Sequence, residues 1–416
     1  MKKEGSFLLA VSGGIDSMVM AHLFVGSPYK KIVILHCNFM LRGIDSDKDE
    51  ALVRGWALEH QIPFFVKRFD TAGYAADKKI SIEMAARFLR YQWFQELRQE
   101  LGFDWIAVAH HANDHAETTL LNLIRGSGIR GVCGISSLQG NIVRPMLGFC
   151  REQIEAYAHK QKIPFREDVT NAQLDIPRNR IRHAVVPELA KINSGVVARM
   201  RENGIYLQQA RDILLELTYI KRELWCRQDG EALLFDIELI KKDKHIAFWM
   251  FELLYPFGFE TGGINQIVNL LHGRTGQKVM SYSHILYKDR DYLALVPKDT
   301  TLPPNFTVTQ HESSGYKIIP NQKIAALDAD KLQLPLSIRL WKEGDRFIPL
   351  GMKGFKKVSD FLIDVKIPLW KKERQYVLCC GADIVWVEGQ RIDDRYKVTA
   401  ATKQVAEIKI SQNCNE

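Results

Sequence analysis

The most constraining feature of this chain is an apolar run near its N-terminus that leads through a glycine turn into an apolar helix. Phe7–Val11 has the length and composition of a buried strand, and Met18–Phe24 those of a buried helix. Between them lies the turn Ser12-Gly13-Gly14-Ile15-Asp16-Ser17. A strand that runs through such a turn into a helix directs backbone N–H groups and the positive end of the helix dipole at one point, where α/β proteins hold phosphate.

The residue types of this turn favour nucleotide phosphates as its ligand. Gly13 and Gly14 let the backbone approach an anion closely, and Ser12 and Ser17 add hydroxyl donors. Asp16 fits beside phosphates when a divalent cation lies between them, because carboxylate and phosphate oxygens together are the usual ligands of Mg²⁺. The alternative is a tight turn with a Ser/Asp helix cap. A Walker A loop is excluded, because no Gly-Lys-Ser/Thr follows.

Strand-like and helix-like patterns alternate through the first third of the chain. Strands are predicted at Phe7–Val11, Lys31–His36, Phe64–Arg68 and Trp105–Ala109, and helices at Met18–Val25, Asp47–His60, Ile82–Leu101 and Asp114–Ile124. This alternation predicts an α/β domain with a parallel sheet and helices on both faces. Ligands of such sheets bind beyond the carboxyl ends of the strands, so functional residues are expected just after each strand.

Polar residues gather where these strands are expected to end. His36 opens a polar segment after the second strand, and His110 and His111 follow the fourth. Asp114 and Glu117 share a helical face with His110. Two carboxylates and an imidazole can hold Mg²⁺, bind an ammonium group or move protons. The alternative is an N-cap cluster, since Asn and Asp suit a helix start.

Arginines mark further candidate contacts with anions. Arg87, on the third predicted helix, can clamp an anionic group, and a solvated salt-bridged stripe is the alternative. Arg125 precedes the segment Gly126–Gly131 and Arg130 lies within it. The segment spells G-x-G-x-x-G but follows a helix, so we reject a dinucleotide site and predict a loop near the active face. A dense basic run that suits a phosphate backbone contains Arg178, Arg180 and Arg182.

The second half divides after a long helix and at a proline pair. Val196–Arg222 has the pattern of an amphipathic helix, and Pro303–Pro304 marks a boundary before short β-rich runs. We expect a catalytic domain at 1–186, a helical connector at 187–225, a mostly helical middle domain at 226–300 and a small α+β domain at 301–416. In the last domain basic residues alternate with aromatic ones, as on RNA-binding surfaces, although charge runs are usually solvated faces. The basic residues singled out there are Arg346, Lys353, Lys356 and Lys357.

Composition is that of a globular protein, and its basic balance suits a polyanionic partner without proving one. The chain has 416 residues, of which 46% are hydrophobic and 25% charged, and its net charge is +8. No apolar run reaches the length of a membrane span, and Phe7–Val11 is too short for a signal peptide. Seven cysteines without a C-x-x-C pair or zinc spacing fit a reducing cytoplasm and no structural metal.

These motifs occur in one order and together resemble the tRNA(Ile)-lysidine synthetase family of the PP-loop ATP pyrophosphatase superfamily. The motifs that carry the resemblance are the Ser12–Ser17 turn, His36-x-Asn38-x-x-Leu41-Arg42, Ala86-Arg87-x-x-Arg90-Tyr91, His110-His111-x-x-Asp114-x-x-Glu117-Thr118, Arg125-Gly126-Ser127-Gly128 and Arg178-Asn179-x-Ile181-Arg182. The resemblance is patchier in the middle domain. It implies a first domain that resembles the adenine nucleotide α-hydrolases.

The resemblance implies a two-step ligation. The family uses ATP and Mg²⁺ to adenylate O2 of the wobble cytidine in isoleucine tRNA with a CAU anticodon. The ε-amine of free L-lysine then displaces AMP, and the lysidine product changes codon reading from AUG to AUA.

Site residues carry over by position. The resemblance implies ATP binding by Ser12–Ser17 and His36, with Asp16 on Mg²⁺. The implied catalytic residues are Asp16, Arg87, His110, Asp114 and Glu117, and either His110 or His111 is the active histidine. The implied tRNA contacts are Arg125, Arg130, Arg178, Arg180, Arg182, Arg346, Lys353, Lys356 and Lys357.

Other interpretations compete with this one. A PP-loop tRNA thiolase predicts a catalytic cysteine pair, and a glutamine-dependent ligase predicts an amidotransferase domain; the sequence shows neither. A non-enzymatic RNA-binding protein with a decayed loop conflicts with the intact Asp16, Asp114 and Glu117. The oligomeric state stays open, a homodimer included, as does the residue that takes the proton from the lysine amine.

Overall fold

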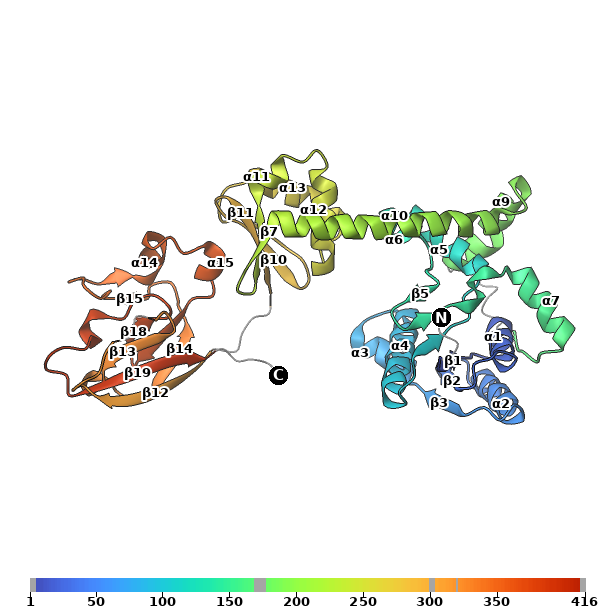
Figure 1. Cartoon of the computed structure of the whole chain (residues 1–416), viewed down its shortest axis with the longest axis horizontal. Helices are drawn as coiled ribbons and strands as arrows, with labels where there is room; N and C mark the ends of the chain where they lie inside the picture. The colour runs from blue at the N-terminus through green and yellow to red at the C-terminus, as the bar shows by residue number, and fades with distance from the viewer. Residues whose placement is uncertain (1–4, 168–176, 299–303, 319–320, 412–416) are drawn as a thin grey trace. The chain divides into compact units, whose positions relative to one another are not determined.

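The chain forms two compact units, Met1–Leu215 and Glu216–Glu416 (Figure 1). The structure is a computed structural model that describes residues 5–167, 177–298, 304–318 and 321–411. The domain boundary expected between residues 300 and 301 lies outside these ranges. Within them, no helix combines the length and the hydropathy needed to cross a membrane.

A sheet of six strands forms the centre of the described part of the first unit. The strands are β1 (Phe7–Ala10), β2 (Ile32–Asn38), β3 (Phe64–Arg68), β4 (Trp105–Ala107), β5 (Leu138–Gln139) and β6 (Ile142–Val143). They lie in the order β3-β2-β1-β4-β6-β5, and each neighbouring pair is parallel except β5 with β6. The predicted parallel sheet is confirmed, and all four predicted strands take part in it.

Helices cover both faces of this sheet (Figure 1). The predicted ones are α1 (Ile15–Val25), α2 (Ile44–Glu59), α4 (Ile82–Glu100) and α5 (Ala112–Ile124). The structure adds α3 (Thr71–Lys78), α6 (Gly128–Val132), α7 (Arg151–Gln161), α8 (Pro177–Arg180), the π-helical turn η3 (Ile181–Val185) and α9 (Val186–Ile192). Alternate residues of β1 point to opposite faces: Leu9 packs in the core with α1, α2 and α7, and Leu8 in the core with α4.

The strand order places the ends of β1 and β4 next to each other. The chain leaves β1 through α1 and returns on one side as β2, whereas β4 lies on the other side of β1. Leu9 pairs with Ala107 in this parallel register. The turn after β1 and the start of α5 after β4 therefore emerge together, at the edge where α/β sheets bind ligands.

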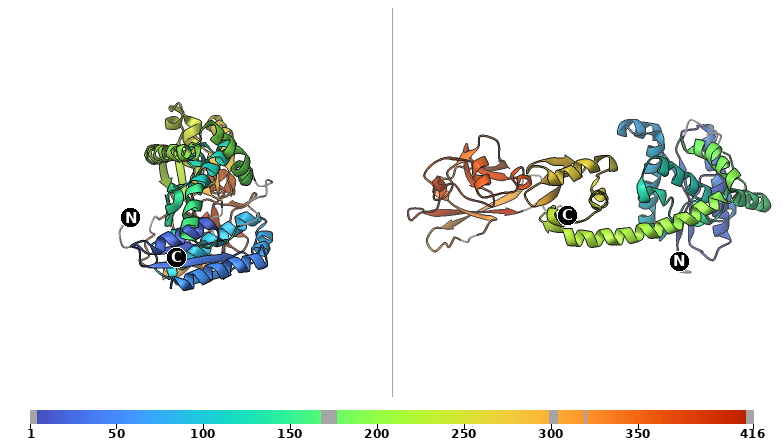
Figure 2. Two further views of the ribbon diagram at one scale, coloured as in Figure 1. Left: turned by 90° about the vertical axis from the view of Figure 1, so that its right-hand side faces the viewer. Right: turned by 90° about the horizontal axis from the view of Figure 1, so that it is seen from above.

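The long helix α10 (Val196–Trp225), predicted as Val196–Arg222, is one continuous helix (Figure 2). It packs against α5 at a glycine, Gly204. A Cβ at Gly204 would lie 2.3 Å from Nε2 of His115, and a Cβ at Gly134 would lie 2.5 Å from Cε1 of the same ring. The ring is only 1% exposed, and its Nδ1 accepts a hydrogen bond from the backbone N–H of Ile135 at 3.1 Å. Two glycines thus enclose His115 and let α10 approach α5 closely.

We predict that Gly204→Ala destabilises the protein. Alanine is ordinarily preferred over glycine inside a helix by about 0.5–1 kcal/mol, but here the methyl group meets a ring that has no room to move. A net loss of about 1–3 kcal/mol is expected. The matched control is Gly55→Ala in α2, where an added Cβ meets nothing within 4 Å. Thermal unfolding followed by circular dichroism should separate the two variants, and equal midpoints would contradict the packing argument.

The middle part of the chain combines helices with an antiparallel sheet. Helices α11 (Ile237–Lys241), α12 (Ile246–Leu254) and α13 (Ile264–His272) accompany strands β7 (Cys226–Asp229), β8 (Ala232–Asp236), β9 (Lys278–Met280), β10 (His284–Lys288) and β11 (Tyr292–Pro297). The five strands lie in the order β7-β8-β11-β10-β9. This part of the chain contains more strand than the mostly helical domain predicted from the sequence. The prediction missed these strands because continuous apolar runs such as those of β8 and β11 have no periodicity that distinguishes a buried strand from a buried helix.

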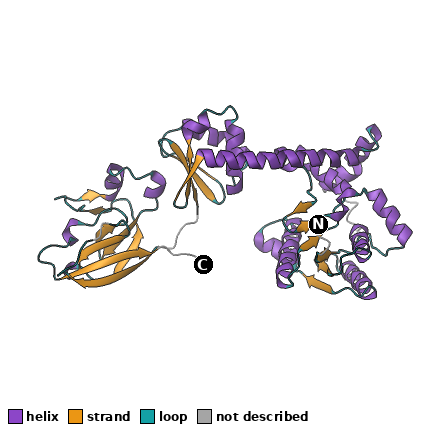
Figure 3. Cartoon of the chain, in the orientation of Figure 1, coloured by secondary structure: helices purple, strands orange, loops and turns teal. Residues whose placement is uncertain are grey.

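Strands dominate the last part of the chain (Figure 3). One sheet contains β12 (Asn305–Glu312), β13 (Ile324–Asp328) and β19 (Gln404–Ser411), and another β14 (Leu336–Leu340), β17 (Tyr376–Cys380) and β18 (Asp383–Val387). A hairpin of β15 (Arg346–Phe347) and β16 (Lys356–Lys357) precedes α14 (Val358–Asp364) and α15 (Leu369–Lys372). The expected α+β character is confirmed.

Candidate active site

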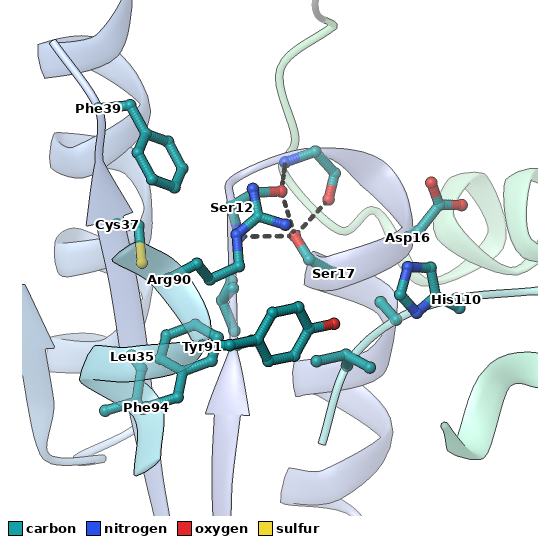
Figure 4. A pocket seen from close by; sticks show the side chains of 15 residues that line it. Ser12, Asp16, Ser17, Leu35, Cys37, Phe39, Arg90, Tyr91, Phe94 and His110 are labelled. Carbon is teal, nitrogen blue, oxygen red and sulfur yellow. Dashed lines mark hydrogen bonds between the residues drawn. The ribbon is translucent and has the colours of Figure 1, made fainter. Parts of the chain in front are cut away.

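A cavity of about 260 Å³ lies at the carboxyl ends of β1, β2 and β4 (Figure 4). The turn after β1 supplies one wall through Ser12, Gly14, Asp16 and Ser17. The remaining side chains that line it include Leu35, Cys37, Phe39, Arg90, Tyr91, Phe94, Val108 and His110. Burial raises the pKa of Cys37 to about 12, so this thiol is a neutral, inert part of the wall. The cavity joins a phosphate-type turn to an apolar compartment suited to a nucleobase.

The turn has the conformation that its glycines allow. Gly13 has a φ of +95°, which is unfavourable for other residues. Gly14 is the N-cap of α1, and no described side chain caps that helix through a hydrogen bond. The Ser17 hydroxyl instead donates to the Gly14 carbonyl at 2.8 Å and lies 3.1 Å from the Ser12 hydroxyl. The N-terminal turn of α1 is therefore left for an anion, which argues against the Ser/Asp cap alternative.

Asp16 is engaged by an arginine. Nη1 of Arg151 lies 2.9 and 2.7 Å from its two carboxylate oxygens, and Nε2 of His111 lies 3.7 Å away. Burial raises the pKa of Asp16, and His111 and Arg151 oppose that rise. No group of three or more metal-ligating side chains occurs among the described residues. Mg²⁺ at Asp16 would therefore take most of its ligands from phosphate and water, as Mg²⁺ commonly does.

The adjacent histidines have different places. His111 is the N-cap of α5: its Nδ1 accepts from the N–H of Asn113 at 3.3 Å, and its own N–H donates to Asp114 at 3.0 Å. The N-cap alternative thus describes His111. His110 lines the cavity, where burial lowers its pKa to about 4 even though Asp114 opposes this shift. Of the two, His110 is the one placed to meet a ligand in this cavity.

The carboxylates of α5 are held by two arginines from the basic run. Arg178 donates to Asp114 at 2.8 Å and to Glu117 at 2.9 Å. Arg182 donates to Glu117 at 2.6 and 3.0 Å. Glu117 is 1% exposed. In this structure the guanidinium groups of Arg178 and Arg182 thus contact carboxylates of the same chain, whereas Arg180 between them is exposed, and their contact with tRNA stays a prediction.

Two residues expected at the site lie outside the cavity lining. Arg87 is exposed and stacks over Tyr91 at 5.1 Å, while Arg90, one turn further along α4, lines the cavity. His36 is 2% exposed and its Nδ1 lies 2.9 Å from the Val11 carbonyl, so it supports the strand that ends in the turn. Side chains alternate between the two faces of a strand, so the sequence could have placed His36 on the opposite face of β2 from Leu35 and Cys37, which line the cavity.

The remaining basic residues lie on other surfaces. Arg125 is exposed at the end of α5 and Arg130 is half-buried in α6, which begins inside the segment predicted as a loop. In the second unit, Arg346 and Arg395 lie 5.0 and 5.1 Å from the ring of Phe355, which is 55% exposed. Near them Lys353 and Lys357 are exposed, whereas Lys356 pairs with Asp364. The basic and aromatic residues of this stretch were expected to share an RNA-binding surface, but two of its aromatic residues, Phe347 and Trp370, are buried.

A parallel sheet with a glycine turn at its carboxyl edge and an open helix N-terminus defines a nucleotide-binding domain of the PP-loop class. A family model described as a PP-loop domain matches residues 1–189. Models described as the TilS substrate binding domain and the TilS substrate C-terminal domain match residues 228–298 and 336–410.

The closely similar relatives are tRNA(Ile)-lysidine synthases. That of Bacteroides thetaiotaomicron is 39% identical over 98% of this chain and 96% of its own length. The relatives from Parabacteroides distasonis and Clostridium acetobutylicum are 38% and 31% identical over 97% and 99% of this chain, and over 95% and 96% of their own lengths. The chain belongs to the tRNA(Ile)-lysidine synthase family, whose members are ATP-dependent ligases that modify tRNA, and the resemblance drawn from the motifs is confirmed.

We predict that Arg182→Met destabilises the protein through Glu117. Without Arg182, the buried Glu117 carboxylate keeps only Arg178, and a loss on the order of 2 kcal/mol is expected. Arg180→Met, which changes the exposed arginine of the same segment, is the matched control. Adding Glu117→Gln should recover part of the loss, because the carboxylate that needs the arginine is then absent. Urea unfolding is measured for the unchanged protein, for Arg182→Met, Glu117→Gln and Arg180→Met, and for the double variant, and additivity in the double variant would show that Arg182 does not act through Glu117.

Proposed function

We propose that this chain joins free L-lysine to C2 of the wobble cytidine of isoleucine tRNA with a CAU anticodon. Cytidine O2 attacks the α-phosphorus of ATP and pyrophosphate leaves; the lysine ε-amine then attacks C2 and AMP leaves. The observation that carries the proposal is the adjacency of the turn after β1 and the carboxylate pair of α5, in a chain that belongs to this family along nearly its whole length.

ATP is assigned to the cavity. The turn from Ser12 to Ser17 offers backbone N–H groups and hydroxyls to the phosphates, and the helix dipole of α1 favours the negative charge that develops there. The apolar wall, with Phe39 and Arg90 5.2 Å apart, suits the adenine ring. Asp16 is the residue that would hold Mg²⁺, after its exchange from Arg151. The ion supplies charge neutralisation at the phosphates and the departing pyrophosphate.

The lysine amine is assigned to Asp114 and Glu117. The support for this assignment is that these buried carboxylates already bind cationic nitrogen, in the guanidinium groups of Arg178 and Arg182. A substrate amine would exchange with one of those arginines. A carboxylate at that place can also accept the proton that the amine loses.

The residues after α10 are assigned to tRNA binding. The middle part, 226–300, and the last part, 301–416, match models for substrate domains. The exposed ring of Phe355 has the guanidinium groups of Arg346 and Arg395 within 5.0 and 5.1 Å, and aromatic surface with positive charge beside it is suited to RNA. A cytoplasmic location, where tRNA, ATP and lysine are all available, agrees with the six described cysteines, all of which are free thiols.

The reaction tests the proposal directly. The chain, incubated with ATP, Mg²⁺, labelled lysine and isoleucine tRNA with a CAU anticodon, should place the label in that tRNA and release AMP. Asp16→Asn should lower AMP release by about a hundredfold or more, whereas Asp77→Asn, at an exposed carboxylate paired only with its neighbour Lys78, should leave it unchanged. Incorporation of sulfur or glutamine nitrogen in place of lysine would overturn the proposal.

The basic surface near Phe355 has its own test. Lys353→Ala with Lys357→Ala should weaken tRNA binding and reduce the slope of log K against log salt concentration by about 0.7–0.9 for each phosphate that the variant no longer neutralises. The control is Lys323→Ala with Lys409→Ala, which removes the same charge at the sheet of β12, β13 and β19. Equal slopes for the two double variants would show that Lys353 and Lys357 are solvated charges that do not contact tRNA.

A further inference from the structure

Arg144 is a buried arginine directly behind the active cavity. It follows β6 and is 5% exposed. Its guanidinium donates to the Ser136 carbonyl at 2.8 Å, to Oε1 of Gln139 at 3.1 Å and to Nδ1 of His110 at 3.3 Å. No carboxylate forms an ion pair with it among the residues that the structure describes. The Tyr91 side chain is a further hydrogen-bond partner. A buried charge without a counter-ion is costly, so this set of neutral partners calls for an explanation.

The bond to His110 determines where the histidine carries its proton. A guanidinium only donates hydrogen bonds and stays protonated at any ordinary pH. Nδ1 of His110 must therefore be the unprotonated nitrogen, and the neutral ring carries its proton on Nε2. Burial lowers the pKa of this ring to about 4, Asp114 opposes the shift, and Arg144, Arg178 and Arg87 reinforce it. The ring is neutral at pH 7.

The three nitrogens of the guanidinium divide into two roles. Nη1 and Nη2 bind the segment around β5 through Ser136 and Gln139, whereas Nε alone contacts His110. His110 is part of the cavity lining, on the same side as Asp16 in Figure 4. The first two bonds would explain a purely structural arginine. Arg144 also interacts with Tyr91, which like His110 lines the cavity, and the bond from Nε is the one that determines the protonation of the His110 ring.

We infer that Arg144 is a positioning residue of the ligation: it fixes His110 as a neutral ring whose Nε2–H donates a hydrogen bond within the cavity. This inference rests on the proposed function, in which negative charge develops on the phosphate oxygens during adenylation. An N–H donor held in advance at that place stabilises such charge. His110 in this tautomer does not take the proton from the lysine amine, because its only free nitrogen already carries one.

The tautomer is measured without any loss of fold. ¹⁵N-histidine NMR of the full chain, with the His110 signals identified by their absence in His110→Asn, should show Nδ1 as the unprotonated, pyridine-like nitrogen and Nε2 as the protonated one. In Arg144→Met the two signals should move toward each other as both tautomers become populated. A protonated Nδ1 in the unchanged protein would overturn the inference whatever reaction the protein catalyses.

Kinetics separates positioning from scaffolding. Arg144→Met should lower the kcat of AMP formation by about ten- to a hundredfold, less than the full loss of a transition-state donor, with little change in the KM for ATP. Arg144→Lys should recover part of this. Gln139→Ala, which removes a bond from the same guanidinium but leaves His110 untouched, should behave as the unchanged protein.

A double variant completes the test. Arg144→Met should cost little further in a protein that already carries His110→Asn, because both changes remove the same donor. Full additivity, or an effect of Gln139→Ala as large as that of Arg144→Met, would make Arg144 structural only. Failure of lysine incorporation by the unchanged protein would sink the proposed function and leave the NMR result standing.

Discussion

The parallel pairing of β1 with β4 is the constraint on which this site depends. Sheet register alone brings the turn that begins at Ser12 beside the helix start at His111, although about a hundred residues of chain separate them. Both segments present helix N-termini, α1 and α5, to the same edge, so two positive dipole ends converge there, although the His111 side chain caps α5. The acidic residues of the site, Asp16 and Asp114, lie in the first turns of these two helices, where negative charge is favoured.

Internal ion pairs satisfy the acidic residues of the site in the described structure. Arg151 holds Asp16, and Arg178 and Arg182 hold Asp114 and Glu117. Isolated buried carboxylates would be costly or would take up protons. In the proposed reaction each cation, Mg²⁺ or an ammonium group, would therefore replace an existing guanidinium rather than enter an empty acidic pocket. The net binding free energy of such a cation is then the difference between its own interaction with the carboxylate and that of the guanidinium it displaces. This favours selectivity over affinity.

The parts of the structure that could be predicted from the sequence are those carried by neighbouring residues. The turn at Gly13, the strand Phe64–Arg68 and the start of α4 at Ile82 each have a local signal, in glycine, in apolar runs or in an N-cap serine. The middle sheet lacks such a signal, because its apolar runs fit a buried helix equally well. Arg90 shared a motif with Arg87, and only the packing of α4 on the sheet decides which of them reaches the cavity.

The partners of the charged residues depend on topology in the same way. Arg151 lies 135 residues from Asp16, Arg178 lies 61 from Glu117, and Arg144 lies 34 from His110. A pattern of residue types along the chain can indicate that an arginine contacts an anion, but it does not indicate which anion. The basic run at Arg178 suited RNA for that reason, and its guanidinium groups contact carboxylates of the same chain.

These internal pairs also bear on proton transfer. Burial by itself raises the pKa of Asp114, and His111 and Arg178 lower it below its ordinary range. With the arginines in place, the carboxylate is a strong cation binder and a weak base. When a substrate ammonium displaces Arg178, gives up a proton and attacks C2 as the neutral amine, the Arg178 charge that lowered the pKa of Asp114 is gone, while the burial that raises it persists. The same exchange that admits the nucleophile therefore makes the carboxylate more basic at the step in which a proton must leave the nitrogen.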